Sequence, residues 1–126
     1  MKTVQEAVER VRLACRATDM HTACSAKQAG YLHGLISARA RVPRELHYPV
    51  LEVVFGCEII SFGQITFQTC RALIDLLLSD PDTAALLYTI HEAIRPFATG
   101  GDTVLPGDYK EFLFVCGKEE IHAYQG

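Results

Sequence analysis

The chain has 126 residues, of which 49% are hydrophobic and 21% are charged, and its formal net charge is −3. This length and apolar content suffice for one domain with a sizeable core. No apolar run approaches the roughly 20 residues that cross a bilayer, and the N-terminal segment is charged and amphipathic, unlike a signal sequence. We therefore expect a single cytoplasmic domain with no membrane partner.

Charge is distributed unevenly along the chain. Residues 1–47 carry eight Lys or Arg against four Asp or Glu, a balance of +4, and residues 48–126 carry four against eleven, a balance of −7. A basic half is suited to phosphates, and an acidic half to a basic protein. Ordinary solvated surfaces on both halves would give the same pattern.

The first quarter of the chain predicts two helices joined by a loop. Apolar residues at three- to four-residue spacing indicate an amphipathic helix from Thr3 to Ala17. The stretch Thr18 to Cys24 lacks this period and is predicted as a loop. Ser25 and Gln28 have the spacing of a capping box, so a second helix is expected to begin there.

The apolar run over residues 49–55 is short and ends at Gly56. We interpret it as a helix with Gly56 as its left-handed cap. A strand is the alternative, because the run is rich in β-branched residues and short runs are ambiguous by period.

Two further helices are predicted from their start signals. Thr66 is a suitable N-cap for a helix through Leu78. Asp80 caps well and Pro81 fits a first helical position, so a fifth helix is expected over about 82–95.

The C-terminal segment, residues 100–126, is rich in turn residues and has two interpretations. An apolar run over 112–116 is separated from Ile121 and Tyr124 by Gly117 and charged residues, which favours a β-hairpin. Asp108 and Glu111 have capping-box spacing, which would start a last helix instead. We favour the hairpin, and predict a mainly α fold, a compact bundle of about five helices.

The second helix and its C-terminal end contain the best candidates for contact with nucleic acid. Basic side chains suit backbone phosphates, and an exposed tyrosine can stack on a base. The basic candidates are Lys27, Arg39, Arg41 and Arg44, with His33 and His47 nearby, and the aromatic candidates are Tyr31 and Tyr48.

The stretch from Ser25 to Leu78 contains a series of caps and spaced apolar residues. The pattern consists of Ser25, Lys27, Gln28, Leu32, Leu35, Phe55, Gly56, Ile65, Thr66, Cys70, Leu73, Ile74, Asp75 and Leu77. It resembles a small helical module appended to phage and bacterial single-strand annealing proteins and found in other DNA-associated phage proteins. The family usually has an Ala-Ser pair where Cys70 and Arg71 stand, and the loop between its first two helices is not normally so arginine-rich. The resemblance implies a phage or mobile-element setting, without annealing activity, because no annealing core precedes the module.

Motifs for catalysis or metal binding are weak. Cys15, His21 and Cys24 lie close in sequence but lack the paired arms of a zinc site, and the five cysteines are expected to be reduced thiols. His91 and Glu92 begin like a zinc-peptidase helix, but Arg95 stands where the second histidine would be. We expect no enzyme activity, no metal and no cofactor.

Two functions from different classes fit these features. The first is an accessory protein that binds nucleic acid, or a complex that handles it, through the arginines. The alternative is a protein inhibitor or adaptor, for instance an anti-defence protein that blocks a CRISPR nuclease, acting through carboxylates of the acidic half. The carboxylates expected to act in this alternative are Asp102, Asp108, Glu119 and Glu120. An unpaired edge on the predicted hairpin would also allow a homodimer.

Overall fold

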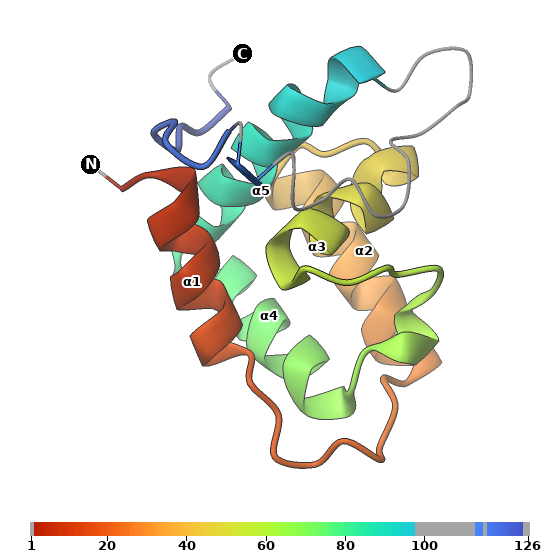
Figure 1. The fold of residues 1–126 in the computed structure, drawn as a ribbon. Coiled ribbons are helices and arrows are strands. Elements are labelled where there is room, and N and C mark those ends of the chain that lie inside the picture. Colours follow the sequence, from red (N-terminus) through yellow and green to blue (C-terminus); the bar gives the residue numbers. More distant parts are fainter. Residues whose placement is uncertain (1, 98–112, 115, 125–126) are drawn as a thin grey trace.

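The described part of the protein is a bundle of five α-helices (Figure 1). The computed structural model describes residues 2–97, 113–114 and 116–124. The helices are α1 (Val4–Ala14), α2 (Ala26–Arg39), α3 (His47–Phe55), α4 (Phe67–Ser79) and α5 (Pro81–Ile94), with 3-10 turns η1 (Arg44–Leu46), η2 (Phe62–Gln64) and η3 (Arg95–Phe97). The described residues form two isolated β-bridges but no longer strand. The predicted mainly α fold is therefore confirmed.

The helices α1, α2, α4 and α5 each follow a residue whose side chain caps them, whereas α3 has no side-chain cap. The Ser25 hydroxyl accepts the Gln28 backbone N–H at 3.1 Å, and the Gln28 side chain accepts the Ser25 N–H at 3.2 Å, which completes the predicted capping box. The Thr66 hydroxyl caps α4 by accepting the Thr69 backbone N–H, and the Asp80 carboxylate caps α5 by accepting the Asp82 backbone N–H. α1 ends at Ala14, earlier than the predicted Ala17.

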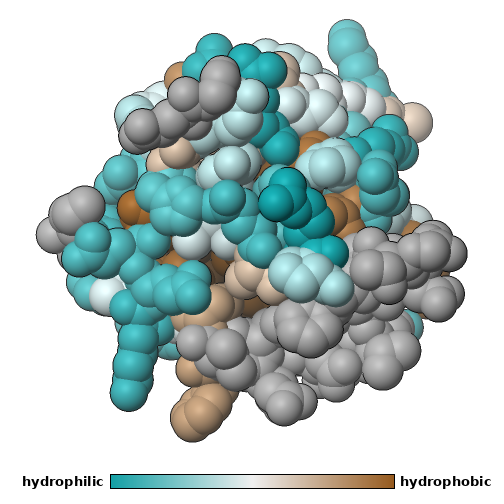
Figure 2. Space-filling model, turned by 90° about the horizontal axis from the view of Figure 1, so that it is seen from above, coloured by the Kyte–Doolittle hydropathy of each residue, from teal (hydrophilic) through white to brown (hydrophobic). Residues whose placement is uncertain are grey.

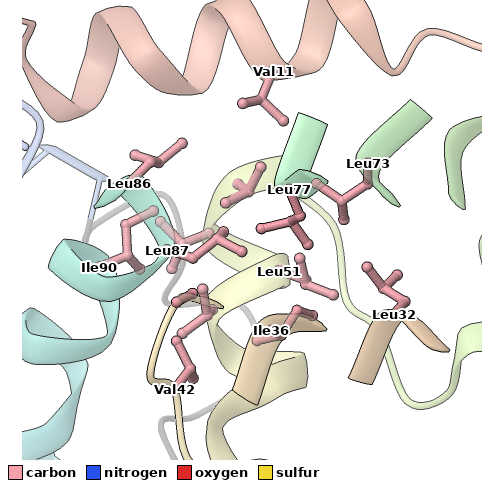
Figure 3. Close-up of a cluster of buried hydrophobic side chains, with 14 of the residues drawn as sticks. Val11, Leu32, Ile36, Val42, Leu51, Leu73, Leu77, Leu86, Leu87 and Ile90 are labelled. Carbon is pink, nitrogen blue, oxygen red and sulfur yellow. The ribbon is translucent and has the colours of Figure 1, made fainter. Parts of the chain in front are cut away.

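α3 lies in the middle of the bundle, where it contacts both α1 and α5 (Figure 1). Its side chains Val50, Leu51, Val53 and Val54 are all buried. Around Leu51, apolar side chains from the other helices fill the core, as Figure 3 shows. A helix that is apolar all round belongs in a core, which explains why its sequence has no clear period.

Arg12 of α1 holds the C-terminal end of α3. Its guanidinium donates hydrogen bonds to the carbonyl oxygens of Val54 and, at 3.2 Å, of Val53. These carbonyls belong to the last turn of α3, where carbonyls lack helical partners. Gly56 follows with a φ of +69°, and a Cβ on it would lie 2.9 Å from an Arg12 nitrogen. The left-handed backbone therefore favours glycine here, as its predicted role as a cap implied.

The C-terminal segment returns to the start of α1. The backbone N–H groups of Val4 and Gln5 donate to the carbonyls of Glu119 and Gly117, at 2.7 and 2.9 Å. Of residues 112–116, Leu113, Phe114 and Cys116 have helical backbone, which ends at Gly117. Residues 98–112 and Val115 lie outside the described residues, so the choice between hairpin and helix stays a prediction. Within the described ranges, no helix is both long and apolar enough to cross a membrane.

Candidate nucleic-acid interface

Three arginines gather at the turn that joins α2 to α3. Arg39 is the last residue of α2, Arg41 follows the C-cap residue, and Arg44 opens the turn η1. All three are exposed, and none forms an ion pair with a carboxylate in the part of the chain that the structure describes. We call these three residues the arginine cluster. No carboxylate among the described residues neutralises the charges of the arginine cluster.

Arg41 has an unusual backbone conformation. Its φ is +56°, in the left-handed region that costs a non-glycine residue about 1 kcal/mol. The guanidinium carbon lies 5.3 Å from the centroid of the Tyr124 ring, within the range of a cation–π interaction. The left-handed turn thus ends α2 and brings an arginine against the C-terminal segment.

Lys27 and Tyr31 lie on α2 but apart from the arginine cluster. Both are exposed, Tyr31 with 51% of its surface accessible. Twelve residues separate Lys27 from Arg39, which corresponds to about 18 Å along the helix axis. The five predicted contact residues therefore form two groups, and only the three arginines share one turn.

His33 and His47, expected near the basic residues, are buried inside the bundle. They are 7% and 0% exposed, and their Nδ1 atoms lie 2.7 Å apart. The expectation that these histidines help to contact phosphates is wrong, because their rings do not reach the surface. Their polar atoms are used within the fold instead.

The two histidines belong to a chain of hydrogen bonds in which each ring nitrogen can be assigned as donor or acceptor. A carbonyl can only accept, so His47 Nε2 carries the proton donated to the Val42 carbonyl at 3.0 Å. His47 Nδ1 is then an acceptor for His33 Nδ1–H, which leaves His33 Nε2 to accept the Tyr48 hydroxyl at 3.3 Å. This arrangement requires both rings to be neutral, which the lowered pKa values of both histidines support. Burial, with Arg44 nearby, lowers the pKa of His33 to about 4, and burial also lowers the pKa of His47.

Tyr48 belongs to the same internal network. Its ring meets Phe62 edge to face with centroids 5.1 Å apart, and Phe62 stacks on His33 at 4.2 Å. With the hydroxyl bonded to His33 and the ring packed, Tyr48 is not a free surface for a base. Of the two predicted stacking tyrosines, only Tyr31 is exposed.

A groove of about 310 Å³ lies beside the arginine cluster. It is formed where α4 meets α5, with the end of α2 and the C-terminal segment on its other sides. Its lining residues include Arg39, Leu77, Leu78, Asp80, Ala84, Tyr88 and Tyr124. Nothing in the sequence pattern indicated this groove, because residues 39, 78, 88 and 124 come together only in the folded chain.

The acidic residues of the alternative hypothesis are only partly described. Asp102 and Asp108 lie outside the described residues. Glu119 and Glu120 are exposed where the C-terminal segment meets the N-terminal end of α1. Figure 2 shows one face of the molecule, on which hydrophilic side chains cover most of the described surface.

The cysteines considered for metal binding do not form such a site with His21. Cys15 is buried and caps the end of α1, Cys24 is half-buried, and His21 is exposed in the loop between α1 and α2. The Cys24 thiol donates instead to the Ser25 carbonyl at 3.5 Å, and burial raises the pKa of the Cys70 thiol. Among the described residues, no group of three metal-binding side chains is present.

Comparisons with family models, curated proteins and solved structures give no match.

Proposed function

We propose that the protein binds nucleic acid through the arginine cluster, as a non-enzymatic accessory to a nucleic-acid-handling process. The observation that carries the proposal is the exposure of Arg39, Arg41 and Arg44 on one turn, with no ion pair to a described carboxylate. Arginine presents several donors in a planar fork that matches phosphate oxygens. Three such groups on one turn suit a phosphodiester backbone better than a single anion.

The charge near the arginine cluster matters more for binding than the net charge of the whole chain. The net charge is −3, but surface charges more than about 10 Å apart are largely screened at 0.1 M salt. A strand at the arginine cluster therefore experiences the nearby guanidinium groups more than the distant carboxylates. Three phosphate contacts predict modest affinity that falls as salt rises, because each contact releases counterions.

The biological setting comes from the sequence resemblance. The stretch from Ser25 to Leu78 resembles a module of DNA-associated phage proteins, although the loop that holds Arg41 and Arg44 is not normally so arginine-rich in that family. We propose a phage or mobile-element protein on this basis. A role as an inhibitor through the acidic residues is the alternative, and no contact among the described residues favours it.

Fluorescence anisotropy with a labelled 20-nucleotide oligothymidine at low salt tests the binding. The triple variant Arg39→Gln, Arg41→Gln, Arg44→Gln is compared with a control that removes the same charge elsewhere: Arg16→Gln, Arg71→Gln, Lys118→Gln. These control residues are also exposed and make no ion pair with a described residue. We expect the cluster variant to lose at least about tenfold in affinity, and the control to lose much less.

Two results would contradict the proposal. One is an equal loss in both triple variants, which would mean that only overall charge matters. The other is no binding of single- or double-stranded nucleic acid by the wild-type protein at low salt. Thermal unfolding of each variant checks that the affinities compare folded proteins.

A further inference from the structure

The groove beside the arginine cluster has the size of a small-ligand site. Its volume of about 310 Å³ is at the lower end of the range for such sites. Leu77, which is 2% exposed, and Ala85, which is 8% exposed, are buried lining residues, and Leu78 is 43% exposed. A flat, largely apolar group such as one nucleobase would cover this surface.

Two tyrosines line the groove and meet each other. The rings of Tyr88 and Tyr124 pack edge to face with centroids 5.6 Å apart, and Tyr124 is 47% exposed. Base stacking on an aromatic ring tolerates any sequence, because every base has a π-face. The groove thus offers aromatic surface to a base without selecting its identity.

Positive charge lies at the side of the groove. Arg39 is one of its lining residues, and Arg41 lies against the ring of Tyr124, another lining residue. Arg44 extends this charge along the turn beyond the groove. An apolar, aromatic groove with several cations beside it is complementary to a ligand that joins flat bases to successive phosphates.

The acidic residue among those lining the groove is already paired. Asp80 accepts the Asp82 backbone N–H at 3.1 Å and the Thr83 hydroxyl at 3.2 Å. Its carboxylate also lies 2.9 Å from a guanidinium nitrogen of Arg10. This ion pair offsets the repulsion that Asp80 would exert on a phosphate.

We propose that the groove between α4, α5 and Tyr124 holds one unstacked base of a single strand whose phosphates the arginine cluster binds. This inference rests on the proposed function and adds the part of the ligand that the arginines do not contact. It predicts that single strands bind more tightly than duplexes, in which bases are paired and stacked. It also predicts that affinity depends on the presence of bases and little on their sequence.

The test fills the groove without changing charge. Ala84 is a half-buried helical residue that lines the groove, so Ala84→Leu occupies the space of the base. Ala14→Leu is the matched control, because Ala14 is an exposed helical alanine outside the groove. Affinities are measured by anisotropy for the 20-nucleotide oligothymidine and for an abasic strand of the same length.

Wild type and the control should bind the oligothymidine about tenfold more tightly than the abasic strand, which is roughly what one stacked base contributes to affinity. Ala84→Leu should lose most of this preference while binding the abasic strand as wild type does. Tyr124→Leu, which removes an exposed ring and fills no space, should weaken the preference in the same direction. It serves as a second variant if Ala84→Leu unfolds.

The possible failures are distinguishable. If wild type binds both strands equally, and the arginine variant alone weakens binding, the base site is wrong and the proposed function stands. If Ala84→Leu and Tyr124→Leu both keep the full preference for bases, the base lies elsewhere and the inference is overturned. If wild type binds neither strand at low salt, both proposals fail.

Discussion

Two polar clusters lie within a few residues of each other in sequence, and the fold uses them in opposite ways. His33 and His47 are buried with their ring nitrogens bonded inside the bundle, whereas Arg39, Arg41 and Arg44 are exposed without a described carboxylate partner. The histidines fix α2 against the start of α3. The arginines occupy the turn between these helices, where no described carboxylate pairs with them.

This contrast distinguishes residues that should matter for stability from residues that should matter for binding. A buried polar network is costly to break, because each unpaired group keeps its desolvation cost without a hydrogen bond. An exposed arginine contributes little to stability, since water replaces its contacts. Substitutions in the histidine pair should therefore change folding, and substitutions in the arginine cluster should change binding.

The largest effect is expected from His47→Ala. The substitution leaves a cavity and removes the acceptor of His33 Nδ1–H, so the free energy of unfolding should fall by about 3 kcal/mol. Urea denaturation at pH 7 measures it. The folded fraction should still bind nucleic acid with nearly wild-type affinity. A loss below about 1 kcal/mol would contradict the structural role given to the pair.

Lowering the pH is expected to reduce the free energy of unfolding by a smaller amount. The folded protein holds His33 neutral, with a pKa of about 4 against an ordinary value of 6.5, and burial lowers the pKa of His47 and His91 too. Below pH 6.5 the unfolded chain therefore binds more protons than the folded one, and stability must fall as the pH falls. His33 alone is expected to contribute a loss of about 2 kcal/mol between pH 7 and pH 5, to which His47 and His91 add. Denaturation curves that coincide at the two pH values would contradict neutral, buried histidines.

The smallest expected change in stability comes from substitutions of Arg41 alone. Arg41→Ala and Arg41→Gly both remove the contact with Tyr124, but only glycine adopts the left-handed backbone without strain. The glycine variant should therefore be more stable than the alanine variant by about 1 kcal/mol. Thermal unfolding of the two proteins makes the comparison. Equal stability would mean that the turn after α2 carries no strain.

The helix starts and stops could be predicted because their signals are local. Ser25 with Gln28, Thr66, Asp80 and Gly56 each act within one helical turn, so neighbouring residues suffice to identify them. The secondary structure of α3 was harder to predict, since a short apolar run without a clear period fits either a buried helix or a buried strand. The structure resolves it as a helix.

The site could be predicted only in part. The exposure of Arg39, Arg41 and Arg44 follows from their place at and beyond a helix end. The burial of His33 depends on Phe62 and Tyr48, and the groove depends on Tyr124 meeting α4 and α5. Such contacts between distant parts of the chain leave no periodic signal in one sequence.

The salt dependence of binding shows whether the arginine cluster contacts the phosphates of a single strand. Each arginine that neutralises a phosphate of a single strand contributes about 0.7 to the slope of log affinity against log salt. The slope for the Arg39→Gln, Arg41→Gln, Arg44→Gln variant should therefore be shallower than the wild-type slope by about 2, while the control with three distant charges removed keeps nearly the wild-type slope. Parallel lines for the wild-type protein and the cluster variant would show that the arginines do not contact the phosphates.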